Sequence, residues 1–193
     1  MRELRESILR QGQCVGDSIV KVDMFLNHRL DTRLMFAMGR ELADYFGKDK
    51  PDIVLTVEAS GIALALAAAH FLDDIPVVFA KKSPAANQSA DMLTAVAHSF
   101  THGNDNALRV DRRYLPAGSR VLVVDDFLAD GEASRALISI AEQAGCTLVG
   151  VGIAVEKGLQ PGGRKLREAG VNLKSLAIVT SIQDGRIQLA DDD

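Results

Sequence analysis

Two adjacent carboxylates follow an apolar run in the middle part of the chain. Asp125 and Asp126 come directly after the four apolar residues Val121–Val124, a run typical of a buried strand. Charged side chains are costly at the end of a buried strand unless they have ligands to hold. Ligands of open α/β sheets bind at the carboxyl ends of the strands, so this acidic pair is the first candidate for chemistry.

The segment after the acidic pair is rich in small and turn-forming residues and leads into a predicted helix. It comprises Ala129, Asp130, Gly131, Glu132, Ala133 and Ser134. The free backbone N–H groups and the positive dipole end of such a helix favour a phosphate group. A ligand with neighbouring hydroxyl groups at one end and a phosphate at the other would satisfy both features, and a ribose 5-phosphate has that layout.

Two simpler explanations of the acidic pair stand beside a ligand site. A similar pair follows a strand at the phosphoacceptor site of response-regulator receivers, but there it normally lies near the chain start, whereas this pair begins at residue 125. Acidic residues also occur in exposed turns and helix caps without any ligand. The complete segment of strand, acidic pair and glycine loop favours the ligand site over both.

The elements that must position these residues are predicted to alternate between strand and helix. Short apolar runs predict strands at 52–57, 76–80, 120–126 and 147–157. One helix is predicted from an N-cap at Asp31 to Gly47, with an apolar stripe of Leu34, Met35, Met38, Leu42, Tyr45 and Phe46. Further helices are predicted after a turn at 58–61 and from 131 to 145, and a mobile loop at 83–91 leads into an antiparallel strand at 92–100. This order predicts an α/β fold with an open, mainly parallel sheet flanked by helices.

Length and composition limit the domain organisation and the compartment. The chain has 193 residues, enough for a single domain spanning 1–193 with one sizeable core. Its formal net charge of −4 lacks the basic excess of proteins that bind nucleic acid. Cys14 and Cys146 are predicted to be free thiols in a reducing compartment, and the sequence has no pattern of a signal peptide or a membrane span. We therefore expect a cytoplasmic protein that binds neither nucleic acid nor a membrane.

Several segments carry a resemblance to a known family. The sequence VLVVDDFLADGEAS at 121–134 resembles the diphosphoribose-binding motif of type I phosphoribosyltransferases. IVKVDMFLNH, EASGIA, PVVFAKK, LTAVAHSFT and AVEKGLQPG are similar, in order and spacing, to the bacterial xanthine-specific branch of that family. The resemblance covers nearly the whole chain and implies the type I phosphoribosyltransferase fold. It also implies a homodimer, and a small hood over the base site formed by residues of about 1–30 and 158–193.

The implied reaction moves the phosphoribosyl group of 5-phosphoribosyl 1-diphosphate to xanthine, giving xanthosine 5'-monophosphate and pyrophosphate in purine salvage. Asp125 and Asp126 would hold the ribose hydroxyls and stabilise the positive charge that develops on the ring. The segment Ala129–Ser134 would bind the 5-phosphate through its backbone N–H groups. Mg2+ would bridge the pyrophosphate and the ribose hydroxyls with few protein ligands, and no cluster of metal-ligating residues is visible in the sequence.

For the pyrophosphate, the resemblance points to a turn and to the end of the following strand. The residues are Glu58, Ala59, Ser60 and Gly61 in the turn, and Lys81 with Lys82 beside it. An ordinary helix cap by Ser60 and a solvated pair of lysines are the alternatives. The segment 83–91 keeps the expected length but lacks the threonine- and lysine-rich character of the family.

For the purine base, the resemblance points to Val20, Asn27 and Lys157, and Phe127, which follows the acidic pair, is a further candidate contact. Asn27 matches the residue that the xanthine-specific branch uses on the 2-oxo group, and a base without that group would leave the amide unpaired. A core position for Phe127 and an exposed strand end for Lys157 are the alternatives. None of the histidines is assigned as an acid or base. The competing functions are transfer to guanine or hypoxanthine, and a nonenzymatic regulator that senses the sugar diphosphate.

Overall fold

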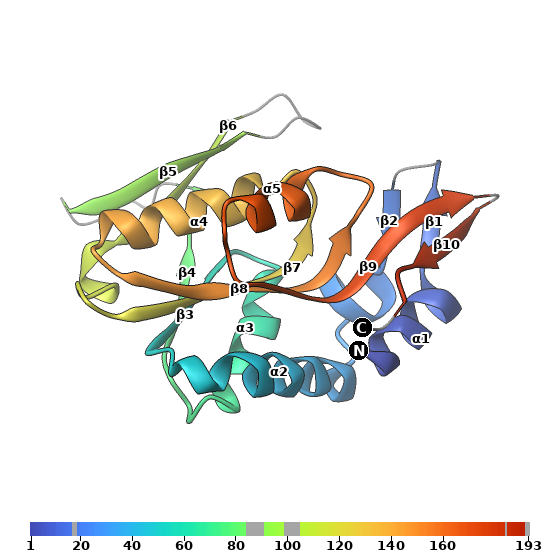
Figure 1. The fold of residues 1–193 in the computed structure, drawn as a ribbon, viewed down its shortest axis with the longest axis horizontal. Helices are drawn as coiled ribbons and strands as arrows, with labels where there is room; N and C mark the ends of the chain where they lie inside the picture. The colour runs from blue at the N-terminus through green and yellow to red at the C-terminus, as the bar shows by residue number, and fades with distance from the viewer. Residues whose placement is uncertain (17–18, 84–90, 99–104, 184, 192–193) are drawn as a thin grey trace.

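The central feature of the fold is a six-stranded sheet (Figure 1). The computed structural model describes residues 1–16, 19–83, 91–98, 105–183 and 185–191. The sheet has the order β10-β9-β8-β7-β3-β4. Its strands are β3 (Ile53–Val57), β4 (Val77–Ala80), β7 (Arg120–Leu128), β8 (Thr147–Lys157), β9 (Leu173–Gln183) and β10 (Arg186–Leu189). Neighbouring strands are parallel except for the antiparallel edge pair of β9 and β10, so the predicted open, mainly parallel α/β sheet is confirmed.

Helices cover both faces of the sheet. The helices α2 (Thr32–Phe46) and α3 (Gly61–His70) lie on one face, and α4 (Glu132–Gln143) and α5 (Gly162–Glu168) lie on the other (Figure 1). In β7, Leu122 and Val124 belong to the apolar cluster on the α2 side, whereas Val121 and Val123 belong to the cluster on the α4 side. Because both faces of β7 are covered, this strand is a continuous apolar run rather than an alternating one.

The helix α2 follows its sequence pattern with one exception. The Asp31 carboxylate accepts a hydrogen bond from the Leu34 N–H at 3.1 Å, so the predicted N-cap is confirmed. The buried members of the predicted stripe are Leu34, Met35, Met38, Leu42 and Phe46. The prediction for Tyr45 is wrong, because Phe46 takes the inward position and the exposed Tyr45 hydroxyl donates to Asn172 Oδ1 at 3.0 Å.

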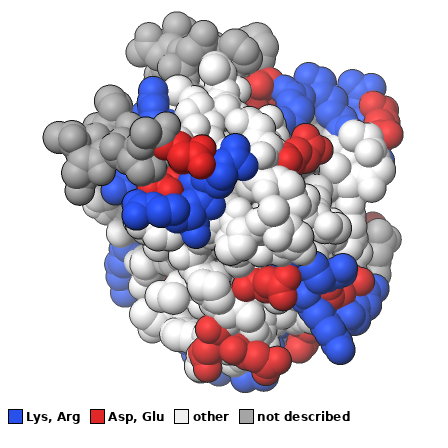
Figure 2. Space-filling view, turned by 90° about the vertical axis from the view of Figure 1, so that its left-hand side faces the viewer, with Lys and Arg blue, Asp and Glu red and all other residues white. Residues whose placement is uncertain are grey.

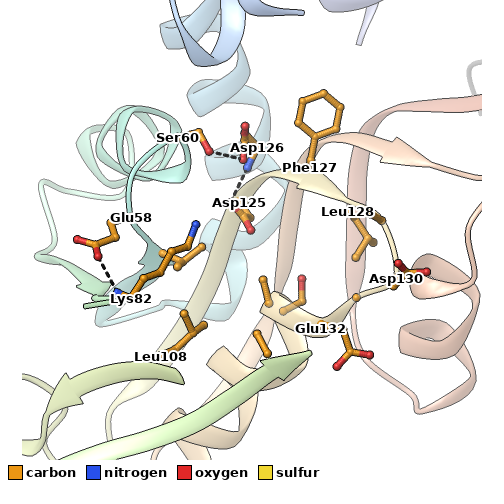
Figure 3. Close-up of a pocket in the computed structure, with 16 residues that line it drawn as sticks. Glu58, Ser60, Lys82, Leu108, Asp125, Asp126, Phe127, Leu128, Asp130 and Glu132 are labelled. Atoms are coloured by element: carbon orange, nitrogen blue, oxygen red, sulfur yellow. Dashed lines mark hydrogen bonds between the residues drawn. The ribbon is translucent and has the colours of Figure 1, made fainter. Parts of the chain in front are cut away.

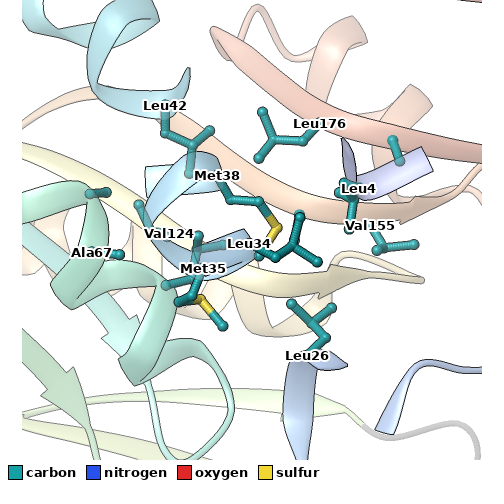
Figure 4. Packing of buried hydrophobic residues seen from close by; sticks show 14 of the residues in the cluster. Leu4, Leu26, Leu34, Met35, Met38, Leu42, Ala67, Val124, Val155 and Leu176 are labelled. Atoms are coloured by element: carbon teal, nitrogen blue, oxygen red, sulfur yellow. The ribbon is translucent and has the colours of Figure 1, made fainter. Parts of the chain in front are cut away.

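Segments from both ends of the chain lie together at one end of the molecule (Figure 1). They are α1 (Arg2–Gln11), the antiparallel pair β1 (Gln13–Val15) and β2 (Ile19–Lys21), the π-helix η1 (Asp23–Asn27), and β9 with β10. Figure 4 shows Leu4 of α1 beside Leu34 of α2 and Leu176 of β9. The sequence pattern predicts none of the four N-terminal elements, because β1, β2 and η1 have only three to five residues and α1 gains its stability from packing on α2, β9 and β10.

A separate antiparallel hairpin lies over α4 (Figure 1). Its strands are β5 (Met92–His98), which confirms the antiparallel strand predicted at 92–100 except for 99–100, which lie outside the described residues, and β6 (Asp105–Asp111), which the sequence pattern does not predict. Backbone hydrogen bonds of 2.9 and 3.0 Å between Lys81 and Arg109 join the hairpin to the end of β4. Of the loop predicted at 83–91, residues 84–90 lie outside the described residues. Two short 3-10 helices, η2 (Gly47–Asp49) and η3 (Arg112–Tyr114), complete the fold.

The charged side chains of the surface are mixed in sign. Figure 2 shows one end of the molecule, where most Lys and Arg side chains lie beside Asp and Glu side chains around an uncharged area. This mixture agrees with the net charge of −4. Within the part of the chain that the structure describes, no helix has the length and apolar character needed to cross a membrane.

A close contact between α2 and α3 leads to a stability prediction. A Cβ atom at Gly39 would lie 2.5 Å from the Ala67 carbonyl carbon, whereas one at Gly47 would meet nothing closer than Leu72 Cδ2 at 3.6 Å. We expect Gly39→Ala to lower the free energy of unfolding by about 1–3 kcal/mol, because the helices must separate. The matched variant Gly47→Ala should change it by no more than about 0.5 kcal/mol. Urea unfolding measures both, and equal midpoints for the two variants would contradict the close packing.

Candidate active site

The acidic pair lies inside strand β7 rather than after it. β7 continues to Leu128, two residues beyond the predicted end at Asp126, and Asp125 remains in register with Ile153 of β8. The Asp125 and Asp126 side chains are only 5% and 6% exposed. Consecutive side chains of a strand point to opposite faces of the sheet, so each carboxylate has its own surroundings. The Asp126 N–H donates to Asp125 Oδ1 at 2.9 Å and links the two residues.

Asp126 is the meeting point of three segments that are far apart in the sequence. The Ser60 hydroxyl, from the turn after β3, donates to Asp126 Oδ1 at 3.0 Å (Figure 3). The Asn27 side-chain amide, from the end of η1, donates to Asp126 Oδ2 at 3.4 Å. The structure therefore connects the predicted pyrophosphate turn and a predicted base contact to the same carboxylate.

Asp125 has a different environment. Burial, followed by the negative charge of Asp126, raises the pKa of Asp125 well above its ordinary value, and the Lys82 charge partly opposes this shift. A Cβ atom at Gly61 would lie 2.8 Å from Asp125 Oδ1 and 2.3 Å from Thr56 Oγ1. Glycine at position 61 thus lets α3 begin directly against the carboxylate. Asp125 carries a charge that the protein alone stabilises poorly, which suits a site for a ligand with hydroxyl donors or a cation.

The helix α4 begins at the pocket without a side-chain cap. Its N-cap is Gly131, with φ of +83°, and no side chain among the described residues caps this end. A Cβ atom at Gly131 would also lie 3.2 Å from Gly162 Cα, so conformation and space both favour glycine. The first N–H groups of a helix have no partner within the helix. They are left for a ligand beside the acidic pair.

The helix α3 offers a second free N-terminus. Ser60 is its N-cap residue, but the Ser60 side chain makes no capping hydrogen bond and donates to Asp126 instead. The alternative that Ser60 is an ordinary helix cap is therefore wrong. Two helix N-termini that favour anions thus flank one pair of carboxylates.

These elements surround a pocket of about 280 Å3 (Figure 3). It is lined by Val57, Glu58, Ser60, Lys82, Ala97, Leu108 and all ten residues from Asp125 to Ser134. The Lys82 side chain extends towards Asp125 in Figure 3. The Lys82 backbone N–H donates to Glu58 Oε1 at 2.6 Å. Lys81 is exposed and does not line this pocket, because its backbone pairs with Arg109 and turns it away. Of the predicted turn, Ala59 and Gly61 also lie outside the lining.

Most of the predicted base contacts lie near the carboxyl end of β7. The Lys157 ammonium is 5.3 Å from the centre of the Phe127 ring, a cation–π distance. Phe127 lines the pocket and packs against the apolar cluster that contains the buried Val20. Asn27 reaches Asp126, the residue before Phe127. The structure thus brings Asn27 and Phe127 next to the acidic pair and Lys157 next to Phe127, whereas Val20 is placed only in the apolar cluster that Phe127 contacts.

Comparison with known proteins identifies the family. Residues 26–184 match the family model of the phosphoribosyl transferase domain. The chain belongs to the phosphoribosyltransferase family. Xanthine phosphoribosyltransferase 1 of Clostridium perfringens is 44% identical over 187 residues, which cover 97% of this chain and 98% of that protein. Xanthine phosphoribosyltransferase of Bifidobacterium animalis subsp. lactis is 47% identical over 182 residues, covering 94% of each.

Solved phosphoribosyltransferases share the fold at lower identity. The APRTase of Giardia lamblia, complexed with 9-deazaadenine, superimposes with a TM-score of 0.75 at 19% identity, covering 91% of this chain and 96% of that chain. Adenine phosphoribosyltransferase of Rhodothermus marinus gives a TM-score of 0.74 at 22% identity, covering 93% and 100%. These two structures establish the phosphoribosyltransferase fold of this chain.

Two pocket residues of this phosphoribosyltransferase fold come from the hairpin, a part of the structure that was only half predicted. Ala97 of β5 and Leu108 of β6 line the pocket. The alternation of the buried Leu108 and Val110 with polar neighbours is a signal that could have identified β6. Among the described residues, no group of three or more His, Cys, Asp and Glu side chains is arranged to hold a metal ion.

The raised pKa of Asp125 predicts a conflict between stability and activity in this phosphoribosyltransferase site. Between the ordinary carboxyl pKa and the raised folded value, the folded state binds more protons than the unfolded chain, so stability falls as pH rises. Asp125→Asn removes this titration. We expect the variant to resist urea better than wild type at neutral pH, with an advantage that shrinks as pH falls, and to lose at least about 100-fold in kcat/KM.

The matched control for this prediction is Asp126→Asn. It removes the charge that accepts hydrogen bonds from Ser60 and Asn27, so it should be no more stable than wild type. Urea unfolding across a pH series measures the difference. An Asp125→Asn variant that is less stable than wild type at neutral pH would contradict the role of burial at this carboxylate.

Proposed function

We propose that this chain transfers the phosphoribosyl group from 5-phosphoribosyl 1-diphosphate to xanthine, giving xanthosine 5'-monophosphate and pyrophosphate in purine salvage. The observation that carries the proposal is the buried pair Asp125 and Asp126 between two helix N-termini without side-chain caps. Such a site matches a substrate with ribose hydroxyls between two phosphate groups. The relatives named xanthine phosphoribosyltransferase, similar over nearly the whole chain, support xanthine as the acceptor.

In this proposal each helix N-terminus binds one phosphate end of the substrate. The backbone N–H groups of Ala129–Ser134 hold the 5-phosphate, and the turn Glu58–Gly61 holds the pyrophosphate. Lys82 supplies a positive charge between the turn and Asp125, which supports a role in stabilising the departing pyrophosphate. Lys81 is proposed as a weaker, outer contact, since it is exposed beside Lys82.

The acidic pair acts on the reaction through its charge. As the bond between the ribose carbon and the pyrophosphate oxygen breaks, its electron pair leaves with pyrophosphate and positive charge develops on the ring. Asp125 and Asp126 are fixed in β7, so their carboxylates stabilise this charge without reorganising. The incoming purine nitrogen then forms the new bond to the same carbon. Both residues are electrostatic groups and neither is a nucleophile.

The site also fits Mg2+, as the substrate-held ion that the family resemblance implies. Mg2+ favours oxygen ligands and is often bound by one or two carboxylates together with substrate phosphates. Asp125 and Asp126 are the side chains that would hold it, and the raised pKa of Asp125 is in keeping with a missing positive partner. When bound, the ion would neutralise charge on the diphosphate.

For the base, we propose that Asn27 pairs with the 2-oxo group and Lys157 with another carbonyl edge of the purine. Val20 and Phe127 supply apolar contact. The position of Asn27 beside Asp126, and the contact between Lys157 and Phe127, support this arrangement. Within the proposed hood segments at about 1–30 and 158–193, α1, β1, β2, η1 and the β9–β10 pair lie together at one end of the molecule, whereas α5 covers a face of the sheet (Figure 1).

We also propose a homodimer that acts in the cytoplasm. Two exposed apolar side chains on neighbouring helices, Phe36 of α2 and Leu66 of α3, support a surface that a partner covers. Cys14 and Cys146 are free thiols, which suits a reducing compartment.

The function is tested by turnover of four bases. With Mg2+ and 5-phosphoribosyl 1-diphosphate, we expect xanthosine 5'-monophosphate and pyrophosphate from xanthine, at a higher kcat/KM than with guanine, hypoxanthine or adenine. Chromatography of the nucleotide product measures each rate, and Asp126→Asn serves as the inactive control. Faster turnover of guanine or hypoxanthine would show that this base, and not xanthine, is the preferred acceptor. If none of the purines is turned over, the proposed enzymatic function is wrong and a regulator that senses the sugar diphosphate is favoured.

The role of Asn27 is tested with one variant on two bases. Because hypoxanthine lacks the 2-oxo group, Asn27→Ala should raise KM for xanthine by about 10- to 100-fold and leave the kinetics with hypoxanthine nearly unchanged. Steady-state kinetics measures both. An equal loss for both bases would contradict base recognition and indicate that Asn27 acts through its hydrogen bond to Asp126.

A further inference from the structure

Gly162, the first residue of α5, lies directly against the loop that begins α4. The Gly162 N–H donates to the Ala129 carbonyl at 3.0 Å. A Cβ atom at Gly162 would lie 2.3 Å from that oxygen and 2.6 Å from the Gly131 nitrogen. No side chain fits there unless the loop moves. The position of α5 therefore fixes the position of the Ala129–Gly131 backbone.

Gly163 makes an equally close contact on the other side. A Cβ atom at Gly163 would lie 1.9 Å from Glu156 Oε1 and 2.7 Å from Arg167 Nη1. The two consecutive glycines are thus enclosed between the loop and an ion pair. Any displacement of the ion pair changes the space available to the two glycines. Because Gly162 contacts the loop, this change also affects the position of the loop.

The ion pair of Glu156 and Arg167 is held in a single geometry. Arg167 donates from Nη1 to Glu156 Oε1 at 2.8 Å and from Nη2 to Oε2 at 2.7 Å. The Ser175 hydroxyl adds a third hydrogen bond to Oε2 at 2.5 Å. Glu156 is only 4% exposed, and although burial opposes its ionisation, the donors Arg167 and Ser175 lower its pKa on balance. A forked guanidinium–carboxylate pair fixes orientation as well as distance.

We propose that Glu156 and Arg167 are positioning residues for the 5-phosphate-binding loop, acting through Gly162 and Gly163. The inference rests on the proposed function, because it assigns Ala129–Ser134 to the 5-phosphate. Neither residue lines the pocket. The helix α5 has seven residues, too few to be stable alone, so the fork from Arg167 to β8 and the buried Leu166 hold it in place. Without the two hydrogen bonds between Arg167 and Glu156, Gly162 is no longer held in position, and the Ala129 carbonyl can reorient.

The kinetic test compares two arginines of the same helix. Arg167→Met should raise KM for 5-phosphoribosyl 1-diphosphate by on the order of tenfold or more, since small displacements of a binding group are costly. KM for xanthine should stay nearly unchanged. The control is Arg164→Met, which removes an exposed ion pair with Glu168 at 3.9 Å, and it should match wild type. Equal rises in both KM values for Arg167→Met, or the same effect from Arg164→Met, would overturn the proposal.

A second measurement tests whether the ion pair and Gly162 act on the same loop. Calorimetric titration with ribose 5-phosphate should give weaker binding for Arg167→Met and for Gly162→Ala. The double variant should bind no more weakly than the worse single variant, because both act on the same loop. Additive losses, or wild-type binding by Arg167→Met, would overturn the inference alone. A wild-type protein that binds no ribose 5-phosphate would overturn the proposed function as well.

Discussion

Two neighbouring carboxylates are buried in the central strand of the sheet, and the surrounding elements are arranged to give this charge partners. Asp126 has its partners within the protein, the hydroxyl of Ser60 and the amide of Asn27. Asp125 accepts the Asp126 backbone N–H and faces the pocket, with Lys82 as the opposing charge. Uncompensated charge in a buried strand lowers stability, so such an arrangement is expected where a ligand supplies the missing partner.

The backbone contacts around the acidic pair depend on glycine at several positions. Gly61 lets α3 begin against Asp125. Gly131 has a left-handed conformation at the N-cap of α4, and Gly162 lets α5 pack directly against this N-cap. In each case a side chain would meet backbone or carboxylate atoms. The two helix ends are therefore held close to one strand by the absence of side chains, and the N–H groups that face the ligand are set by packing outside the pocket.

The parts of the fold that could be predicted are those in which the local sequence decides the structure. β3, β7 and β8 are almost wholly buried and the edge strand β4 is partly so, and the apolar runs of all four are visible without knowledge of their neighbours. The segment from Asp125 to Ser134 is continuous, so its position beside a ligand pocket could be predicted as well. By contrast, α1 depends on packing against α2, β9 and β10, and the direction of the Ser60 hydroxyl depends on residues far away in the sequence. The ion pair of Glu156 and Arg167 has no recognisable sequence pattern, because its proposed role depends on close contacts with Gly163.

The hydrogen bonds of Asp126 have a consequence for how the two substrates influence each other. Ser60 belongs to the proposed pyrophosphate turn and Asn27 to the proposed base site, yet both donate to one carboxylate. A ligand that draws the Asn27 amide away leaves Asp126 with more negative charge for the sugar hydroxyls. Thermodynamic linkage then requires the reverse, so that occupation of the sugar site changes the affinity for the base by the same factor. With these proposed roles, one shared acceptor would make the two binding equilibria cooperative.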